Sequence, residues 1–419
     1  MSVLYNFSIH IFLKVIRLAS LFNSKIRLWV DGRKGWKENL ASYVEGDKNF
    51  KIWFHCASLG EFEQGKPVMQ AIKQAYPQVS IVVTFFSPSG YEARKSNDLA
   101  QYVGYLPADT KENAFDFVEI LSPKMAIFVK SEIWPNFISA IKGNNVPLFL
   151  ISARFFEGQS IFKRNRGFFR NQLKKFDFIF VQDKPSQKQL KKFNIESVLA
   201  GDTRFDQVPQ LITNNVALPV IEQFKGKGNL LVVGSCWMED VHVLTKFINQ
   251  TNATIKILLA PHDVSEKMVL AISDAIKVPF EKYSELVDKK GSTDKKVIIL
   301  DSIGILANAY KYADVAYIGG AFKQGLHNIL EPAVFGIPVV FGPITTGFIE
   351  ATEMLKIGGA FSVSEETETY DLLENLFANE NARNIAGEEN NKYMANKRGA
   401  TEKIMVNAKM ILYRKLENS

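Results

Sequence analysis

The stretch KIWFHCASLGEFEQGKPVMQAIKQAYP, from Lys51 to Pro77, decides the fold. Its apolar opening predicts a buried strand, and the amphipathic pattern after the turn predicts a helix. A strand, a tight turn and a helix form the repeating unit of parallel α/β sheets. Because ligands bind at strand ends in such sheets, the turn residues Ser58, Gly60 and Glu61 are site candidates. Many such turns hold phosphate with glycines, whereas this one carries a carboxylate.

The same alternation continues along the chain and predicts an α/β protein with two parallel sheets whose strand ends face a shared cleft. A polar break with two prolines separates the two series of strands. The predicted strands are 51–57, 79–86, 102–107, 125–130, 146–152, 176–183 and 197–201, then 230–235, 253–261, 297–302, 315–322 and 337–343.

A chain of 419 residues is long enough for two or three domains. The predicted division is an N-terminal helical segment (1–37), a first α/β domain (38–209), a linker (210–228), a second α/β domain (229–400) and a last helix (401–419). By analogy with other two-lobed proteins, that helix would cross back to the first domain.

Charge and cysteine content restrict the function. The formal net charge is +7, which favours anionic partners such as nucleic acid, phospholipid head groups or phosphorylated small molecules. The two cysteines, Cys56 and Cys236, lie far apart and give neither a disulfide framework nor metal-type spacing. The five histidines form no ligand-like cluster, so no metal site is expected.

The first 37 residues are apolar but carry seven Lys/Arg against one Asp, including Lys14 and Arg17. No run of about 18 uncharged apolar residues exists, so a spanning helix is not expected. The basic residues also lie in the wrong place for a secretory signal. The pattern favours a basic amphipathic helix on an anionic membrane surface. The alternative is an ordinary first helix that packs on its own domain.

Nucleotide-type signals lie in the second domain, above all in GGAFKQGLHNILEPAVFGIPVVFGP (319–343). Gly319 and Gly320 follow a predicted strand, and a loop before a helix start suits a phosphate. Glu331 lies one turn into the following segment, where a carboxylate can bind both hydroxyls of a ribose. The alternative is a simple Gly-Gly turn followed by a solvated glutamate.

Three other strand ends of the second domain offer weaker candidates: Gly234 and Ser235, then Pro261 and His262, then Ser302. A helix is predicted to start at Asp301 or Ser302, both good N-cap residues. For each of these alone, capping or packing explains the residue as well as ligand contact does.

The first domain has further polar strand ends and one basic segment. The strand-end candidates are Ser87, Ser89, Gly90 and Glu132. The segment 160–176 has six Lys/Arg, four Phe and no acid. It could bind single-stranded nucleic acid, grip an anionic lipid-bearing substrate, or form a solvated basic helix with a phenylalanine core face.

Taken together, the motifs SLGE, SPSG, SEIWPN, SAR, GDTRFD, DSIG and GGAF…HNILEP…GIPVVFGP occur in the order found in 3-deoxy-D-manno-octulosonic acid (Kdo) transferases. The chain resembles this family from its basic N-terminus to about residue 360. The resemblance implies a GT-B glycosyltransferase of two Rossmann-like lobes facing a central cleft. It implies transfer from CMP-Kdo to a lipid A precursor on the cytoplasmic side of the inner membrane. The N-terminal helix would provide attachment, with no metal, other cofactor or nucleic acid involved.

The resemblance also assigns residues. Glu61 of SLGE matches the family's general base, and we expect the N–H groups of the following helix, whose start Gly65 and Pro67 mark, to keep it ionised at pH 7. Glu331 matches the ribose-binding glutamate. The other residues expected to bind the donor are Gly234, Ser235, Pro261, His262, Ser302, Gly319, Gly320, Lys323, His327 and Asn328; those expected to bind the acceptor are Ser58, Gly60, Ser87, Ser89, Gly90, Glu132, Arg154, Arg164, Arg166 and Arg170.

Two departures from the family pattern stand out. The family usually shows Pro-Arg-His where this chain has Pro261-His262-Asp263, so an arginine expected at the CMP phosphate is missing. Lys323 in the glycine-rich loop is one basic residue that could replace it. Ile305 stands where a glutamate commonly follows DSxG, so the contact expected from that glutamate is missing as well.

Two other classes of protein remain open. A nucleotide-sugar epimerase can share the two-lobed fold, but it needs neither a membrane helix nor a basic aromatic acceptor face. A non-catalytic nucleotide-binding or membrane adaptor protein would not need a carboxylate such as Glu61 at its cleft.

Overall fold

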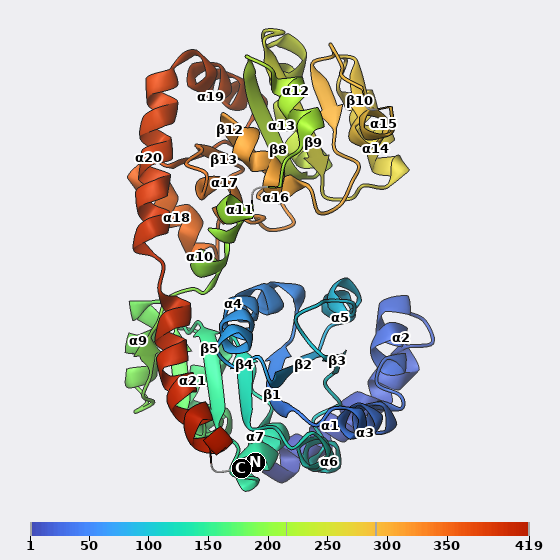
Figure 1. The fold of residues 1–419 in the computed structure, drawn as a ribbon, viewed down its shortest axis with the longest axis vertical. Helices are drawn as coiled ribbons and strands as arrows, with labels where there is room; N and C mark the ends of the chain where they lie inside the picture. The colour runs from blue at the N-terminus through green and yellow to red at the C-terminus, as the bar shows by residue number, and fades with distance from the viewer. Residues whose placement is uncertain (1, 215, 290, 418–419) are drawn as a thin grey trace. The chain divides into compact units, whose positions relative to one another are not determined.

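The computed structural model describes residues 2–214, 216–289 and 291–417. The chain forms two compact units, Met1–Gln207 with Arg398–Ser419, and Val208–Lys397 (Figure 1). Each unit contains one seven-stranded sheet, and every strand pairing is parallel. The two parallel α/β sheets predicted from sequence are confirmed.

The first sheet has the strand order β3-β2-β1-β4-β5-β6-β7. The order reverses between β1 and β4, and ligands of open α/β sheets bind at such a reversal, beyond the carboxyl ends of the strands. The strands are β1 (Phe50–Cys56), β2 (Val79–Phe85), β3 (Tyr102–Tyr105), β4 (Met125–Val129), β5 (Leu148–Ala153), β6 (Phe178–Val181) and β7 (Val198–Leu199).

Helices cover both faces of this sheet, because alternate strand residues are apolar on each side. One face packs against α4 (Leu59–Ala75) and α21 (Ala400–Glu417). The other packs against α3, α6, α7, α8 and α9. The remaining helices of the unit are α1 (Ser2–Ala19), α2 (Ser24–Asp31), α3 (Trp36–Gly46), α5 (Pro88–Arg94), α6 (Lys111–Leu121), α7 (Pro135–Gly143), α8 (Gly167–Leu173), α9 (Lys184–Lys191) and α10 (Arg204–Gln207).

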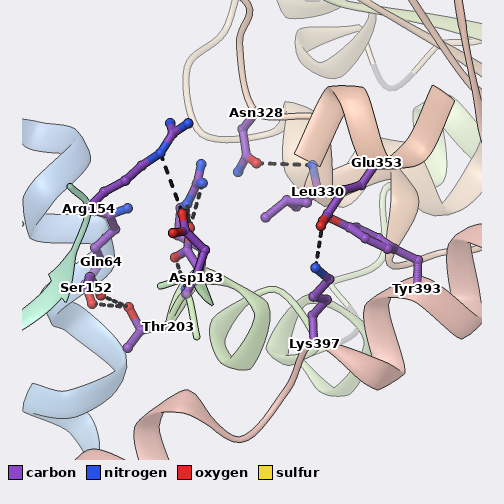
Figure 2. A network of polar contacts seen from close by, with 12 residues as sticks. Gln64, Ser152, Arg154, Asp183, Thr203, Asn328, Leu330, Glu353, Tyr393 and Lys397 are labelled. Atoms are coloured by element: carbon purple, nitrogen blue, oxygen red, sulfur yellow. Dashed lines mark hydrogen bonds and ion pairs between the residues drawn. The ribbon is translucent and has the colours of Figure 1, made fainter. Parts of the chain in front are cut away.

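The GDTRFD motif fastens the last helix to the first unit. The Asp206 carboxylate accepts hydrogen bonds from the Gly399 and Thr401 N–H groups at the start of α21, at 2.6 and 2.7 Å. The buried Thr203 hydroxyl donates to the Gln64 carbonyl of α4 and lies 2.9 Å from the Ser152 hydroxyl (Figure 2). Capping by Asp206 satisfies N–H groups that the first turn of a helix leaves unpaired.

The N-terminal helix α1 is held to the first unit at its beginning. The Tyr5 hydroxyl donates to the Asp109 carboxylate at 2.6 Å, and the Asn136 amide donates to the Asn6 side chain at 2.8 Å. No residue of α1 is buried. By length and composition alone, α1 is also able to span a membrane, with a mean hydropathy of 1.3 over 18 residues.

The second sheet has the order β10-β11-β9-β8-β12-β13-β14, with its reversal between β8 and β12. The three-residue strands β10 and β14 were not predicted, because their segments FEK and AFS are too short to show a period. The strands are β8 (Asn229–Cys236), β9 (Ile255–Pro261), β10 (Phe280–Lys282), β11 (Val297–Ile299), β12 (Val315–Ile318), β13 (Val339–Phe341) and β14 (Ala360–Ser362).

Helices α13, α14 and α19 pack on one face of this sheet. The segment 210–228, expected as a linker, instead contains α11 and α12 and belongs to the second unit. Ile221 and Phe224 of α12 are buried there, so the two prolines mark helix starts rather than a linker. The helices are α11 (Gln210–Thr213), α12 (Pro219–Lys225), α13 (Met238–Gln250), α14 (Glu266–Ala275), α15 (Tyr283–Asp288), α16 (Leu306–Ala309), α17 (Leu330–Ala333), α18 (Ile349–Ile357), α19 (Glu366–Ala378) and α20 (Glu380–Asn396).

Candidate active site

Glu61 lies where the strand order of the first sheet reverses. It is in the first turn of α4, directly after β1, and only 7% of its surface is exposed. Its Oε2 accepts a hydrogen bond from the Ala57 N–H at the end of β1. The carboxylate is therefore held in one orientation by the backbone that precedes its own helix.

Burial, and to a smaller extent the nearby Glu132 carboxylate, raise the pKa of Glu61 to about 7 against the opposing effects of the Ala57 N–H and Lys130. The expectation that helix N–H groups would keep it fully ionised at pH 7 is therefore wrong: desolvation outweighs them. The helix also begins at Leu59, earlier than Gly65 and Pro67 suggested, so Glu61 is inside it. A carboxylate with a pKa near 7 is suited to accept a proton at neutral pH.

A second polar group follows the adjacent strand β4. The Trp134 indole N–H lies 2.8 Å from Glu132 Oε2 and 3.1 Å from His55 Nε2. His55 is fully buried, and its Nδ1 lies 3.1 Å from the Thr84 carbonyl, so a proton on Nδ1 leaves Nε2 to accept from Trp134. This network fixes the Glu132 carboxylate near Glu61.

The neighbouring turn after β2 approaches the same strand ends. The Ser87 N–H donates to the Ala57 carbonyl at 2.8 Å, and the Ser87 hydroxyl caps α5 by accepting from the Gly90 N–H. Any side chain at Gly90 would collide with Phe85, so packing alone explains this glycine. The structure thus gives Ser87 and Gly90 structural roles and places Ser89 beside them, with its hydroxyl 3.4 Å from that of Ser87.

Gly60 does not form the tight turn that was expected from the sequence. It lies within α4, its φ is not positive, and no atom lies within 4 Å of the place where a side chain would begin. Ser58 precedes the helix at its N-cap position without forming a side-chain cap. The first turn of α4 therefore leaves open space beside Glu61.

The basic segment forms two short 3₁₀ turns and α8 rather than one helix. Its arginines differ: Arg170 donates to the carbonyl of Ile161 at 3.1 Å and also to that of Lys163, while Arg164 and Arg166 are exposed. Arg166 helps to line a cavity of about 250 Å³ with Ser131, Ile133, Phe155, Gln159, Ser160, Ile161 and Phe169. Phe176 is buried and Phe162 and Phe169 pack on the core, so three of the four phenylalanines have a structural role.

Arg154 lies at the end of β5, close to this cavity. Its Nε is 3.8 Å from an Asp183 carboxylate oxygen (Figure 2). Its carbonyl accepts from the Ser131 hydroxyl at 3.2 Å. Arg154 follows β5 directly, and Arg166 lines the cavity.

In the second unit, the buried Asp240 organises the reversal between β8 and β12. Its carboxylate accepts from the Trp237 N–H at 2.9 Å, the Gly320 N–H at 3.0 Å and the Tyr317 hydroxyl at 3.1 Å. A side chain at Gly319 would collide with this carboxylate and with the Ser235 carbonyl. The glycine pair thus allows two loops to approach Asp240.

Gly234 and Ser235 also have local explanations. A side chain at Gly234 would collide with the buried Tyr310 hydroxyl. Ser235 has φ +51°, a left-handed conformation that costs a non-glycine residue roughly 1 kcal/mol or more. Strained residues persist where surrounding structure holds them, and they gather at functional sites.

Three aromatic rings meet at the same edge of the second sheet. His262 stacks on Trp237, with ring centroids 4.3 Å apart, and on His327, at 4.7 Å. The Trp237 indole N–H donates to His327 Nε2 at 3.3 Å. The structure thus brings together His262 and His327, which lie 65 positions apart in the sequence.

Asn328 and Glu331 form a pair at the start of α17. The Asn328 amide donates to Glu331 Oε1 at 3.0 Å, and its carbonyl oxygen accepts from the Leu330 N–H at 3.2 Å (Figure 2). The Asn328 side chain thus orients the Glu331 carboxylate and also pairs the first N–H group of the helix. An oriented carboxylate of this kind can accept hydrogen bonds from sugar hydroxyls.

Comparison with known proteins explains this arrangement. The sequence pattern of the family described as 3-Deoxy-D-manno-octulosonic-acid transferase (kdotransferase) matches residues 34–207. A 3-deoxy-D-manno-octulosonic acid transferase of Aquifex aeolicus is 30% identical over 350 residues, which cover 80% of this chain and 88% of the relative. The chain belongs to the Kdo transferase family. A Haemophilus influenzae member is 26% identical over 84% of this chain and 85% of its own.

The fold of this Kdo transferase family member is GT-B, as the sequence predicted. A solved structure of a putative UDP-N-acetylglucosamine 2-epimerase from Listeria monocytogenes matches with a TM-score of 0.60 over 87% of this chain and 97% of its own. Their sequence identity is 12%, so this likeness concerns the fold alone. The transferase relatives, rather than the fold, make this chain a Kdo glycosyltransferase.

Three predicted donor residues of the transferase have weaker structural support. Lys323 is 75% exposed and its Nζ lies 3.9 Å from a Glu239 oxygen. Pro261 is buried within β9. The helix predicted at Asp301 or Ser302 begins only at Leu306, because Asp301 instead accepts from the Ser284 N–H and hydroxyl of α15.

Sequence reasoning did not assign a role to His55, Trp134, Trp237 or Asp240. In the sequence, Trp134 of SEIWPN precedes a proline and Asp240 follows another acid, so each is also explained by a helix start. No signal marked His55 or Trp237, because their partners are remote in sequence. Within residues 2–214, 216–289 and 291–417 no group of three or more His, Cys, Asp or Glu is placed to hold a metal. Independence from metal remains a prediction.

Proposed function

We propose that this protein transfers Kdo from CMP-Kdo to a lipid A precursor, with Glu61 as the general base. The observation that carries the proposal is the buried Glu61 carboxylate at the strand-order reversal, whose pKa lies at about 7. Among members of a transferase family, such a group has a ready use, because the acceptor hydroxyl must lose a proton.

The proposed reaction forms one bond, breaks one bond and transfers one proton. The acceptor oxygen forms a bond to the anomeric carbon of Kdo, and the bond from that carbon to the phosphate oxygen breaks. CMP leaves with the electron pair, and the hydroxyl proton passes to the Glu61 carboxylate. The open space beside Gly60 leaves room for the hydroxyl. No cofactor takes part in this scheme.

A direct assay tests the whole proposal. The protein is incubated with CMP-Kdo and a lipid A precursor, and the mass of the lipid is measured. We expect an increase by one or more Kdo residues. An unchanged lipid with an altered donor sugar would instead indicate an epimerase, and an unchanged lipid with bound, intact nucleotide would indicate a binding protein.

The donor is proposed to bind in the second unit, with the ribose hydroxyls on Glu331 and the phosphate near the Gly319–Gly320 loop. Asn328 supports this role because it already orients the Glu331 carboxylate. The Gly320 N–H is already bound to Asp240 and the Gly319 N–H to the Gly234 carbonyl, so the proposed phosphate contacts come from N–H groups further along the loop. Such groups can meet the negative charge that grows on the leaving phosphate.

Glu331→Ala is expected to weaken CMP binding about tenfold or more, because two hydrogen bonds to a carboxylate are lost. Isothermal titration measures the change. Glu353→Ala is the matched control, since Glu353 belongs to the same unit but binds Tyr393 and Lys397 at 2.7 and 2.6 Å (Figure 2). Equal affinity in the Glu331 variant and its control would rule out the ribose role.

The acceptor is proposed to bind to the first unit, with its phosphates on Arg154, Arg164 and Arg166. Guanidinium groups pair with phosphate through two hydrogen bonds. Arg164 and Arg166 are both exposed, and Arg166 lines the 250 Å³ cavity. Arg170 is proposed to act less directly, because its guanidinium orders the loop at Ile161 and Lys163.

The membrane surface is proposed to bind α1. Six exposed apolar residues follow one side of this helix and its end, with exposed fractions from 47 to 86%: Leu4, Phe7, Ile11, Val15, Leu18 and Phe22. At 100° per residue, the five within the helix fall in a stripe about 80° wide. The bond from Tyr5 to Asp109 holds the start of α1 against the first unit, which favours a helix lying on the cytoplasmic surface of the inner membrane over one crossing it.

Ile11→Asp is expected to weaken binding to phosphatidylglycerol vesicles at least about tenfold, because an apolar contact is lost and a charge must be desolvated. Vesicle sedimentation measures the bound fraction. His10→Asp introduces the same charge on another side of α1 and is expected to change binding much less. If both variants bind equally, the stripe is not the contact surface.

A further inference from the structure

The rings of Trp237, His262 and His327 form one packed group in the second unit. They come from three separate segments, after β8, after β9 and after the glycine-rich loop that follows β12. His262 lies on the other two rings and is otherwise exposed, whereas His327 is half-buried. The backbone N–H of His262 donates to the Cys236 carbonyl at 2.9 Å.

The hydrogen bond between Trp237 and His327 decides which imidazole can carry charge. An indole N–H only donates, so His327 Nε2 must accept and carries no proton. Burial, with a contribution from His262, lowers the pKa of His327 to about 4. The exposed imidazole of His262, rather than that of His327, is therefore the one that an incoming anion can reach. The Trp237 ring face favours a positive charge on that imidazole, because an aromatic face attracts a cation.

The other charged groups around the rings already have partners. The Asp263 carboxylate accepts from the Ser265 N–H and hydroxyl, both at 2.9 Å. Asp240 is occupied by its three donors. From the start of α13, Glu239 lies 3.9 Å from Lys323 of the glycine-rich loop. Among the described residues named here, Lys323 and His262 are the two that can present a positive charge to a ligand at the rings.

We propose that His262 is the anion-binding residue of the donor site and that it takes up a proton from solution when the anionic group of the donor arrives. The inference rests on the proposed binding of CMP-Kdo by the second unit. The donor carries a phosphate and a carboxylate, and either anion beside an imidazole favours its protonated form. Trp237 and His327 act as positioning residues. They pack against the His262 ring, and the positive charge resides on His262 rather than on His327.

The sign of the pH dependence follows from proton uptake. If the bound state holds more protons than the free state, binding is strongest at low pH and weakens as the pH rises. The largest slope is about tenfold in affinity per pH unit for one proton. A guanidinium at the same position stays charged throughout this range and would abolish the dependence.

CMP titration by calorimetry from pH 6.5 to 8.0 tests the proposal in the full chain. CMP itself titrates near pH 6, so the affinity is expressed relative to His262→Arg, which cancels the ligand's own ionisation. We expect the ratio of wild-type to His262→Arg affinity to fall about tenfold over this range. His242→Asn, an exposed histidine of α13, is the matched control and should behave as wild type.

Two buffers of different ionisation enthalpy give an independent readout. Wild type and the His242 control should show the same net proton uptake, and His262→Asn should lose most of it and bind CMP more weakly. A constant affinity ratio and equal proton uptake in His262→Asn would overturn the role of His262 while leaving donor binding intact. Failure of wild type to bind CMP at any pH would overturn the proposed donor site itself, and with it this inference.

Discussion

The Glu61→Gln variant is expected to lose at least about a hundredfold in transfer rate while it binds CMP as tightly as wild type. Glutamine has the size of glutamate and can still accept from the Ala57 N–H, but it cannot take a proton from an attacking hydroxyl. Transfer is measured by product mass at saturating donor, and CMP binding by calorimetry. Transfer close to the wild-type rate would rule out Glu61 as the base.

The pH dependence of wild type gives a second test of the same residue. A base must be ionised, and burial has raised the pKa of Glu61 to about 7. The rate at saturating substrates is therefore expected to rise about tenfold per pH unit below pH 7 and to level off above it. Saturation matters, because donor affinity has its own, opposite dependence through His262. A rate that is flat from pH 5.5 to 8 would contradict the assignment.

The stability of the variant separates a chemical effect from unfolding. The folded-state pKa of Glu61 is raised above the ordinary value near 4.5, so its contribution to stability is present at low pH and lost as the pH rises through about 7. Removing the buried charge should therefore stabilise the variant relative to wild type at pH 8.5, on the order of 2 kcal/mol, and give little gain at pH 5. Thermal melts at the two pH values measure this difference.

The sheets were predictable because each long strand is an apolar run bounded by turn residues. Strands such as β1 and β9 are nearly buried along their whole length, which is the condition under which a continuous apolar run is informative. The prediction failed for β10 and β14, which have three residues each at sheet edges. It also failed at 210–228, where polar composition hid two short helices whose stability comes from packing.

The candidate site was predictable where one short motif contains both the functional residue and the neighbours that position it. Glu61 and the Asn328–Glu331 pair belong to this class. The ionisation of Glu61 was not predictable, because it depends on how deeply the carboxyl is buried and on Glu132, 71 positions away. His55 and Trp237 escaped notice for the same reason: each acts through a partner in a distant loop, Trp134 or His327.

The importance of Asp240 could not be recognised from the sequence. We expect its replacement to cause large losses of stability and of CMP binding. In sequence it is one of two acids at a helix start, where Glu239 looks equally suitable. In the structure Asp240 is fully buried with three donors, while Glu239 has an exposed side chain beside Lys323 and Gln324. The two neighbours therefore form a natural pair for comparison.

Asp240→Ala is expected to destabilise the second unit on the order of 3–5 kcal/mol and to abolish measurable CMP binding. The Trp237 N–H, the Gly320 N–H and the Tyr317 hydroxyl would all be left unpaired in a buried place, at a cost of about 1–3 kcal/mol each before relaxation. Urea unfolding followed by circular dichroism measures the stability, and calorimetry measures the binding. Glu239→Ala should stay within about 0.5 kcal/mol of wild type.

Asp240→Asn distinguishes a folding effect from a binding effect, because asparagine keeps the shape and one accepting oxygen but brings an N–H₂ group toward donors. It should fold, with a smaller loss of stability than the alanine variant, yet bind CMP weakly, since the Gly320 N–H and Trp237 would shift relative to each other. If Asp240→Ala unfolds at the same urea concentration as Glu239→Ala, the carboxylate is not what holds these loops together. If Asp240→Asn binds CMP as wild type does, the placement of the loops by Asp240 is irrelevant to the donor.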